Sequence, residues 1–334
     1  VRLSVVRSIA AGGSPGHALE PGSAVLVATG APLPPGADAV ARWEEVHILP
    51  RGADLRHAQE VALSLPVARG ENVLPSGGQA CKGEPLLEQG DLVDLTALDA
   101  LLTQGIRQVA VWRKPRVGLL PTGSELVPWD GEAGPSQVRC SNQVLLAHQV
   151  RQAGGQPVLL PIVGDDRAAL RQAIARAVKE ERVDLLVTTG GASQGPFDFT
   201  VGAVADLGEV LFAEMAVSPG RGTAFGLVRG VPVLCLPGGA LSARVLFEVL
   251  GRPAILRLGG RRHVLRERLP VRLTEPVQAR RGGTRLVPAC LRPTEDGWIA
   301  QPCRAREFHC PGQWEGLLFL REGTEPVAEV WGPA

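Results

Sequence analysis

The chain has 334 residues, of which 45% are hydrophobic, enough to build buried cores for about two to four domains. Its 35 basic and 34 acidic residues leave a formal net charge of +1 without long runs of either sign, which argues against a general binder of nucleic acid or of anionic membranes. No apolar stretch approaches the ~18 residues that span a bilayer, and the six cysteines are too scattered for a disulfide framework, so we expect a cytoplasmic protein with reduced thiols.

Residues 1–82 predict a mostly β module. Short apolar runs such as SAVLVATG are bounded by Gly and Pro clusters such as APLPPGAD, a pattern typical of strands and turns. Residues 83–113 follow as a linking segment with one amphipathic helix that stops at Gly105. The leucines that recur at helical spacing in this helix are Leu92, Leu95, Leu98 and Leu102.

Residues 114–260 predict a doubly wound parallel α/β sheet. The apolar runs RVGLLP, PVLLPIV, DLLVTT and VPVLCL have the length of strands that are covered on both faces, and helical patterns separate them. The clearest helix is DDRAALRQAIARAVKEE, with acidic residues at its start and one apolar face, and Asn142 is expected to cap the helix before it. Residues 261–334 return to short apolar runs between Pro and Gly, which predicts a small β barrel or sandwich.

Three loops of this sheet have the composition of an anion site: PTGSE at 121–125, TTGGASQG at 188–195 and LPGGALS at 236–242. Ligands of doubly wound sheets bind beyond the carboxyl ends of the strands, where glycines let backbone N–H groups approach a phosphate. A single loop of this kind also has a structural explanation, because strand-to-helix turns need glycine. Three of them in one sheet favour a site for a phosphorylated ligand, although neither the Walker motif nor the G-x-G-x-x-G fingerprint is present.

Acidic residues follow the same strands. Glu125 ends the first loop, Asp165 and Asp166 open the clearest helix, and Asp198 follows the second loop. Hard oxygen ligands beside phosphates are what Mg²⁺ takes. Taken singly, Asp165 is also explained as a helix cap and Asp198 as a turn residue, so the predicted metal site depends on the convergence of Glu125, Asp165 and Asp198 at one edge of the sheet.

Seven motifs then occur in chain order: VATGAPLPPGADAV, LLPTGSELV, SNQVLLAHQVRQAGG, IVGDD, TTGGASQGPFDFT, SPGRGTAFG and CLPGGALSA. Together they resemble the molybdopterin molybdenumtransferases of the MoeA type, the group that includes the gephyrin E domain, over nearly the whole chain. The resemblance implies a molybdopterin-binding domain similar to the MogA and MoaB adenylyltransferases, between the two β parts. It also implies an elongated homodimer, an adenylyltransferase partner, and Mg²⁺-assisted insertion of molybdate into adenylylated molybdopterin with release of AMP.

By motif position, the resemblance gives Glu125, Asp165 and Asp198 catalytic and metal-binding roles, and Arg221 a catalytic role as an anion-binding residue. The residues expected to bind the pterin phosphate and its nucleotide lie in the glycine loops and in the SPGR motif. They are Thr122, Gly123, Thr189, Gly190, Gly191, Ser193, Gly195, Pro219, Gly220, Pro237, Gly238 and Ser242.

The chain departs from the family pattern at several motif positions. Ser218 stands in place of the first lysine of the K-P-G-K motif, Pro196 in place of an acidic residue, and Gln79 in place of the acid of G-E-D-[IV]. The family's DGYA segment would precede Val1, so the chain resembles an N-terminally truncated, divergent member. Two hypotheses follow: an active molybdenumtransferase, or a catalytically weakened homologue that binds molybdopterin or serves as a scaffold.

Overall fold

The computed structural model describes residues 1–49, 57–191, 199–279, 281–303 and 315–330, and the chain divides into two units, Val1–Leu86 and Leu87–Ala334. The elements of the first unit are β1 (Arg2–Ile9), β2 (Ser23–Val27), the 3₁₀ turn η1 (Trp43–Glu45), β3 (Val46–Leu49) and β4 (Glu60–Leu63). Its strands form one sheet in the order β2-β1-β4-β3, with β1 parallel to β2 and antiparallel to β4. The predicted mostly β module is confirmed.

The second unit begins with helix α1 (Leu95–Thr103). Asp94 caps it by accepting a hydrogen bond from the backbone N–H of Ala97 at 2.9 Å, as expected for an N-cap aspartate. Ala97 and Leu101 are buried, whereas Leu98 and Leu102 are 44% and 61% exposed. Leucine spacing therefore identified the helix but not the side of it that is covered.

The strands of the central sheet are β5 (Arg116–Pro121), β8 (Gln156–Leu159), β9 (Leu185–Thr189), β10 (Glu209–Phe212), β12 (Ala224–Val228) and β13 (Val231–Leu236). Their order is β10-β12-β13-β9-β5-β8. Strands β8, β5, β9 and β13 are parallel, which confirms the predicted sheet, but β12 and β10 add an antiparallel edge. The edge is antiparallel because Arg229 and Gly230, both at positive φ, make a two-residue hairpin turn between β12 and β13.

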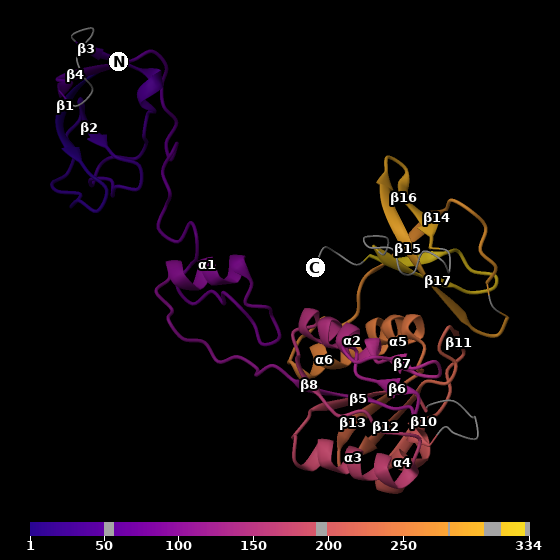
Figure 1. Ribbon diagram of the computed structural model, residues 1–334. Coiled ribbons are helices and arrows are strands. Elements are labelled where there is room, and N and C mark those ends of the chain that lie inside the picture. The colour runs from indigo at the N-terminus through magenta and orange to yellow at the C-terminus, as the bar shows by residue number, and fades with distance from the viewer. Residues whose placement is uncertain (50–56, 192–198, 280, 304–314, 331–334) are drawn as a thin grey trace. The chain divides into compact units, whose positions relative to one another are not determined.

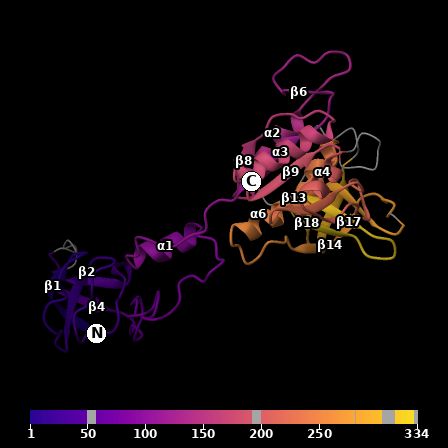
Figure 2. The same ribbon diagram turned by 90° about the horizontal axis from the view of Figure 1, so that it is seen from below.

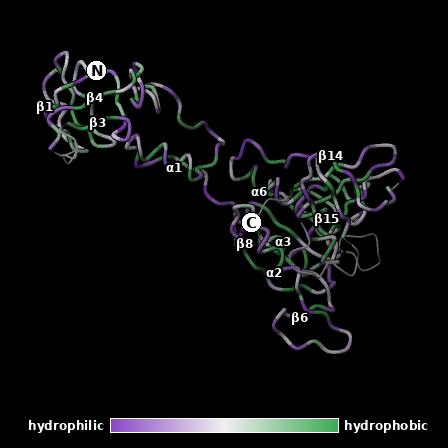
Figure 3. Tube along the Cα trace, turned by 90° about the horizontal axis from the view of Figure 1, so that it is seen from above, coloured by the Kyte–Doolittle hydropathy of each residue, from purple (hydrophilic) through white to green (hydrophobic). Residues whose placement is uncertain are grey.

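Helices cover both faces of this sheet (Figure 1). One face carries α2 (Ser141–Gln152), α5 (Ala240–Leu246), the π-helical turn η3 (Phe247–Gly251) and α6 (Arg252–Leu258), and the other carries α3 (Arg167–Lys179) and α4 (Thr200–Leu207). Neighbouring strand residues point to opposite faces, so Leu119 and Val187 pack on the first face and Leu120 and Leu186 on the second. This two-sided burial explains the continuous apolar runs of the strands, which lie among the green segments of Figure 3.

The C-terminal part is a closed barrel. Its strands are β14 (Arg268–Leu273), β15 (Thr284–Thr294), β16 (Gly297–Pro302), β17 (Gly316–Leu320) and β18 (Val327–Val330), with β11 (Val217–Ser218) added beside β15. Pairing of β15 with both β16 and β17 closes the barrel and confirms the predicted small β domain. Leu286, Leu317 and Phe319 of the barrel belong to the same hydrophobic core as Leu246 and Phe247 of the helical face.

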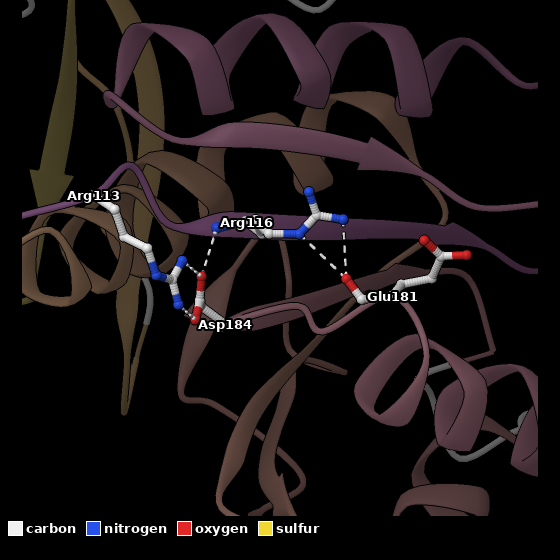
Figure 4. Close-up of polar contacts among 4 residues, drawn as sticks. All are labelled: Arg113, Arg116, Glu181 and Asp184. Atoms are coloured by element: carbon white, nitrogen blue, oxygen red, sulfur yellow. Dashed lines mark hydrogen bonds and ion pairs between the residues drawn. The ribbon is translucent and has the colours of Figure 1, made fainter.

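A polar cluster fixes the entry of the chain into the sheet at the amino ends of β5 and β9 (Figure 4). Arg113 donates two hydrogen bonds to the carboxylate of Asp184, each at 2.6 Å, and the backbone N–H of Arg116 donates a third at 2.7 Å. The hydrogen bond from Arg113 is the main reason that the pKa of Asp184 lies below its usual value. The cluster lies at the edge opposite to the glycine loops and is structural.

The remaining strands, β6 (Leu126–Val127) and β7 (Val138–Arg139), pair with each other and carry a loop that projects from the second unit (Figure 2). Within the described ranges, no helix is both long and apolar enough to cross a membrane. Cys81, Cys140 and Cys235 are free thiols, and burial raises the pKa of the Cys235 thiol to about 11.

Candidate functional site

Four loops meet at the carboxyl edge of the central sheet. Because β5, β9 and β13 are parallel, the loops at 121–125, 188–191 and 236–242 leave the sheet at the same edge. Strand β12 runs the other way, with Ala224 opposite Cys235, so the loop at 218–223 that leads into it lies at this edge too. We call these four segments the carboxyl-edge loops.

The first two carboxyl-edge loops are locked together through two buried threonines. Thr122 donates its backbone N–H and its hydroxyl to the carbonyl oxygen of Thr189, at 2.8 and 3.2 Å. Gly190, at φ +98°, lies so close that a Cβ added to it would stand 2.3 Å from the carbonyl oxygen of Thr122. Glycine is required at position 190 for both its conformation and this close approach.

Thr200, the first residue of α4, holds the same turn from the other side. Its hydroxyl donates to the carbonyl oxygen of Gly190 at 3.2 Å, and its N–H donates to that of Gly191 at 3.1 Å. A Cβ at Gly191, which has φ +59°, would stand 2.6 Å from the Thr200 hydroxyl oxygen. Thr200 is not among the residues expected from the motifs, although a threonine at the start of the helix after a glycine loop is a recognisable signal.

The loop at 236–242 is tied to the first two carboxyl-edge loops and to α2 through Gly190 and Asn142. The N–H of Gly190 donates to the carbonyl oxygen of Leu236 at 3.0 Å, and a Cβ at Gly238 would lie 3.6 Å from the Cα of Gly190. Asn142 was expected to cap α2, but Cys140 is the N-cap residue, and the Asn142 amide donates instead to the carbonyl oxygen of Gly238 at 2.7 Å. The asparagine therefore ties α2 to the loop.

Two neighbouring aspartates at the start of α3 have different roles. Asp166 is the N-cap, accepting from the N–H of Ala169 at 2.7 Å. Asp165 accepts from the N–H of Ser124 at 2.9 Å, while its own N–H donates to the Ser124 hydroxyl at 2.9 Å. This reciprocal pair ties the half-buried Asp165 to the loop that carries the exposed Glu125, the residue after Ser124.

Asp165 is thus held against the loop that carries Glu125, while Ser193, Gly195 and Asp198 lie outside the described residues. Among the residues that the structure does describe, no group of three or more His, Cys, Asp or Glu side chains is placed to hold a metal ion. The metal site of Glu125, Asp165 and Asp198 therefore stays a prediction, and the structure describes only the first two of these carboxylates.

The loop at 218–223 carries Arg221. Pro219 follows a cis peptide bond, and Gly220, at φ +107°, packs so closely on Leu246 that an added Cβ would lie 2.1 Å from a side-chain carbon. The Arg221 side chain is 67% exposed, and its Nη2 lies 3.2 Å from a carboxylate oxygen of Glu214. The predicted anion-binding residue is at the expected edge but has a neighbouring negative charge.

Pro237 and Ser242, two further predicted ligand residues, are half-buried. Pro237 lies in the loop after β13 and Ser242 lies in α5.

A cavity of about 270 Å³ lies where the barrel meets η3, and none of its lining residues belongs to the predicted set. Five of its nine lining residues are apolar, and the other four are two arginines and two threonines. Its Arg268 is paired with Glu329 at 3.1 Å and stacked over Phe319 at 3.9 Å. The cavity also contains Arg321, Thr284 and Thr324, but no glycine-lined backbone and none of the predicted residues, so we place the candidate site at the carboxyl-edge loops.

Comparison with known proteins identifies the family. The model described as "Probable molybdopterin binding domain" matches residues 118–257, and "MoeA N-terminal region (domain I and II)" matches residues 2–105. The molybdopterin molybdenumtransferase of Synechococcus elongatus is 32% identical over 307 residues, which cover 90% of this chain and 72% of that protein. The chain belongs to the molybdopterin molybdenumtransferase family. Molybdopterin molybdenumtransferase 2 of Mycobacterium tuberculosis is likewise 32% identical, over 99% of this chain and 82% of its own.

A solved structure supports the same assignment. The molybdopterin biosynthesis MoeA protein of Pyrococcus horikoshii superposes with a TM-score of 0.74 at 30% identity, covering 100% of this chain and 82% of that one. The chain is thus a member of a molybdenumtransferase family that acts in molybdenum cofactor biosynthesis, and the resemblance stated from its motifs is confirmed.

Proposed function

We propose that the chain catalyses Mg²⁺-dependent insertion of molybdate into adenylylated molybdopterin, with release of AMP. The observation that carries the proposal is that three of the carboxyl-edge loops, at 121–125, 188–191 and 236–242, form one glycine-lined cradle in a chain of this family. Hydrogen bonds of Thr122, Gly190 and Asn142 join these three loops. Backbone without side chains at Gly190, Gly191 and Gly238 suits close approach of a phosphate.

The described carboxylates fit a magnesium ion. One oxygen of Asp165 is held by Ser124, which fixes the direction of the carboxylate, and the exposed Glu125 follows Ser124 in the chain. Mg²⁺ binds through one or two carboxylates and keeps several waters, so Asp165 and Glu125 suffice, with Asp198 as a third proposed ligand. Bound there, Mg²⁺ would neutralise phosphate charge as AMP leaves. Arg221 is proposed to bind the molybdate oxyanion.

The decisive experiment supplies the whole protein with adenylylated molybdopterin, Mg²⁺ and molybdate, and measures AMP release together with formation of active cofactor. We expect both products in equal amounts. Asp198→Ala should lower turnover and change the dependence on Mg²⁺, and an unchanged Mg²⁺ response would remove Asp198 from the metal site. Ligand binding without AMP release would refute the proposed activity and favour the weakened homologue.

We further propose that the chain works as a homodimer in the cytoplasm and receives its substrate from a molybdopterin adenylyltransferase. Within each chain, the proposed domain boundaries are at residues 82, 113 and 260. The support is the family to which the chain belongs. Sedimentation of the whole protein tests the dimer, since a monomer at every concentration would exclude it. A binding measurement with a purified adenylyltransferase tests the partner.

A further inference from the structure

Glu214 and Arg221 face each other across the short turn that carries the SPGR motif. The N–H of Met215 donates to the carbonyl oxygen of Arg221 at 2.9 Å and closes this turn, so the residue before Met215 lies beside the arginine. The Nε of Arg221 donates to Oε2 of Glu214 at 3.3 Å, and Nη2 lies 3.2 Å from the same oxygen. Glu214 thus occupies one edge of the guanidinium, the edge formed by Nε and Nη2.

The opposite edge of the guanidinium, formed by Nη1 and Nη2, keeps the fork geometry that binds a tetrahedral oxyanion through two parallel hydrogen bonds. With Glu214 in place, the turn has a net charge near zero, because Ser218 supplies no charge and the carboxylate cancels that of Arg221. With lysines at both motif positions and Glu214 still present, the turn would carry a net charge of about +1. The side chains are 67% and 35% exposed, so solvent and salt weaken this cancellation without removing it.

We propose that Glu214 is a positioning residue that orients Arg221 towards the oxyanion and at the same time limits the affinity of the site for it. The inference rests on the proposed function, because it takes Arg221 as the oxyanion-binding residue. An arriving dianion gains the attraction of Arg221 and meets the repulsion of Glu214 close by. Occupancy of the site therefore requires a higher oxyanion concentration than an arginine without a carboxylate partner would require.

The test compares Glu214→Gln with the wild-type protein in titration calorimetry, using molybdate in one arm and inorganic phosphate in the other. Glutamine keeps an oxygen that accepts from Arg221 but removes the negative charge. We expect the affinity for molybdate to rise about three- to tenfold at low salt, and the gain to shrink as salt is added. A gain confined to phosphate would assign the turn to the pterin phosphate and overturn the link to molybdate. In turnover, the KM for molybdate should fall without an increase in kcat.

A matched control is Glu180→Gln, since Glu180, the C-cap residue of α3, pairs with Arg176 at the same 3.2 Å and both side chains are exposed. It should leave oxyanion affinity unchanged. Glu214→Ala removes both the charge and the oxygen, and should gain less affinity than Glu214→Gln because Arg221 loses its orientation.

Unchanged or weaker oxyanion binding by Glu214→Gln, with weaker binding by Arg221→Ala, would overturn the inference and leave the proposed function standing. Wild-type affinity in Arg221→Ala would instead refute the role of Arg221 in the proposed function. Absence of oxyanion binding in every protein would refute both.

Discussion

Replacing Gly190 with alanine should open the candidate site. The left-handed conformation at φ +98° costs a residue with a Cβ about 1–2 kcal/mol. The added Cβ would also stand 2.3 Å from the carbonyl oxygen of Thr122, which is backbone and yields only if the turn moves. If the turn moves, the hydrogen bonds from Gly190 to Leu236 and from Thr122 to Thr189 are lost, and each contributes about 1 kcal/mol. The sum is a loss of about 3–4 kcal/mol.

Gly154→Ala is the matched control, because Gly154 has φ +83° and no atom within 4 Å of the added Cβ. It should cost only the conformational 1–2 kcal/mol, roughly. Hydrogen–deuterium exchange of the amides of β9 and β13 in the whole chain measures the opening free energy locally, without requiring two-state unfolding of both units. We expect exchange about thirtyfold faster in Gly190→Ala than in Gly154→Ala, with loss of ligand binding in Gly190→Ala alone. Equal exchange in the two variants would refute the close packing at Thr122.

Three further outcomes are expected. Asp165→Asn should raise the Mg²⁺ concentration needed for half-maximal turnover at unchanged stability, whereas Asp166→Ala should cost about 1 kcal/mol as a lost N-cap without altering turnover; equal effects on turnover would contradict the separate roles. Because the pKa of Asp184 is lowered in the folded protein, its carboxylate stabilises the fold fully above the unfolded-state pKa, and this stabilisation is lost as the pH falls through the folded-state pKa. The difference in urea midpoint between wild type and Asp184→Asn should therefore vanish in acid. A difference that persists in acid would show that ionisation of Asp184 is not its cause. In the folded chain at pH 8, iodoacetamide should modify the exposed Cys81 and spare Cys235, whose buried thiol has a pKa of about 11, as mass spectrometry would show.

The sequence was sufficient for features that depend on neighbouring residues in the chain. The run DLLVTT is apolar throughout because both faces of β9 are covered, and the face of α3 that includes Leu170 and Ile174 is buried as its spacing predicts. The positions of the glycine loops follow from the same reading, since each comes directly after a strand.

Features that depend on contacts between distant residues were not accessible in this way. The pairing of Ser124 with Asp165 spans 41 positions, and the bond from Asn142 to Gly238 spans 96, so no local pattern reveals either. The antiparallel edge depends on a positive φ at Arg229. Arginine rarely adopts this conformation, so the residue type does not predict it. Glu214 carried no motif, and only the folded turn places it beside Arg221.

The barrel and the sheet share one hydrophobic core, in which Leu286, Leu317 and Phe319 pack with Leu246 and Phe247. Strand β11, which leads into the Arg221 turn, is itself paired with barrel strand β15. Truncation after residue 260 would expose part of the hydrophobic core on the helical face of the sheet to solvent. It would also remove the pairing of β11 with β15 that supports the Arg221 turn. The barrel therefore supports the Arg221 turn from a distance, and we expect a substitution inside the barrel to change the proposed oxyanion affinity without contacting the oxyanion.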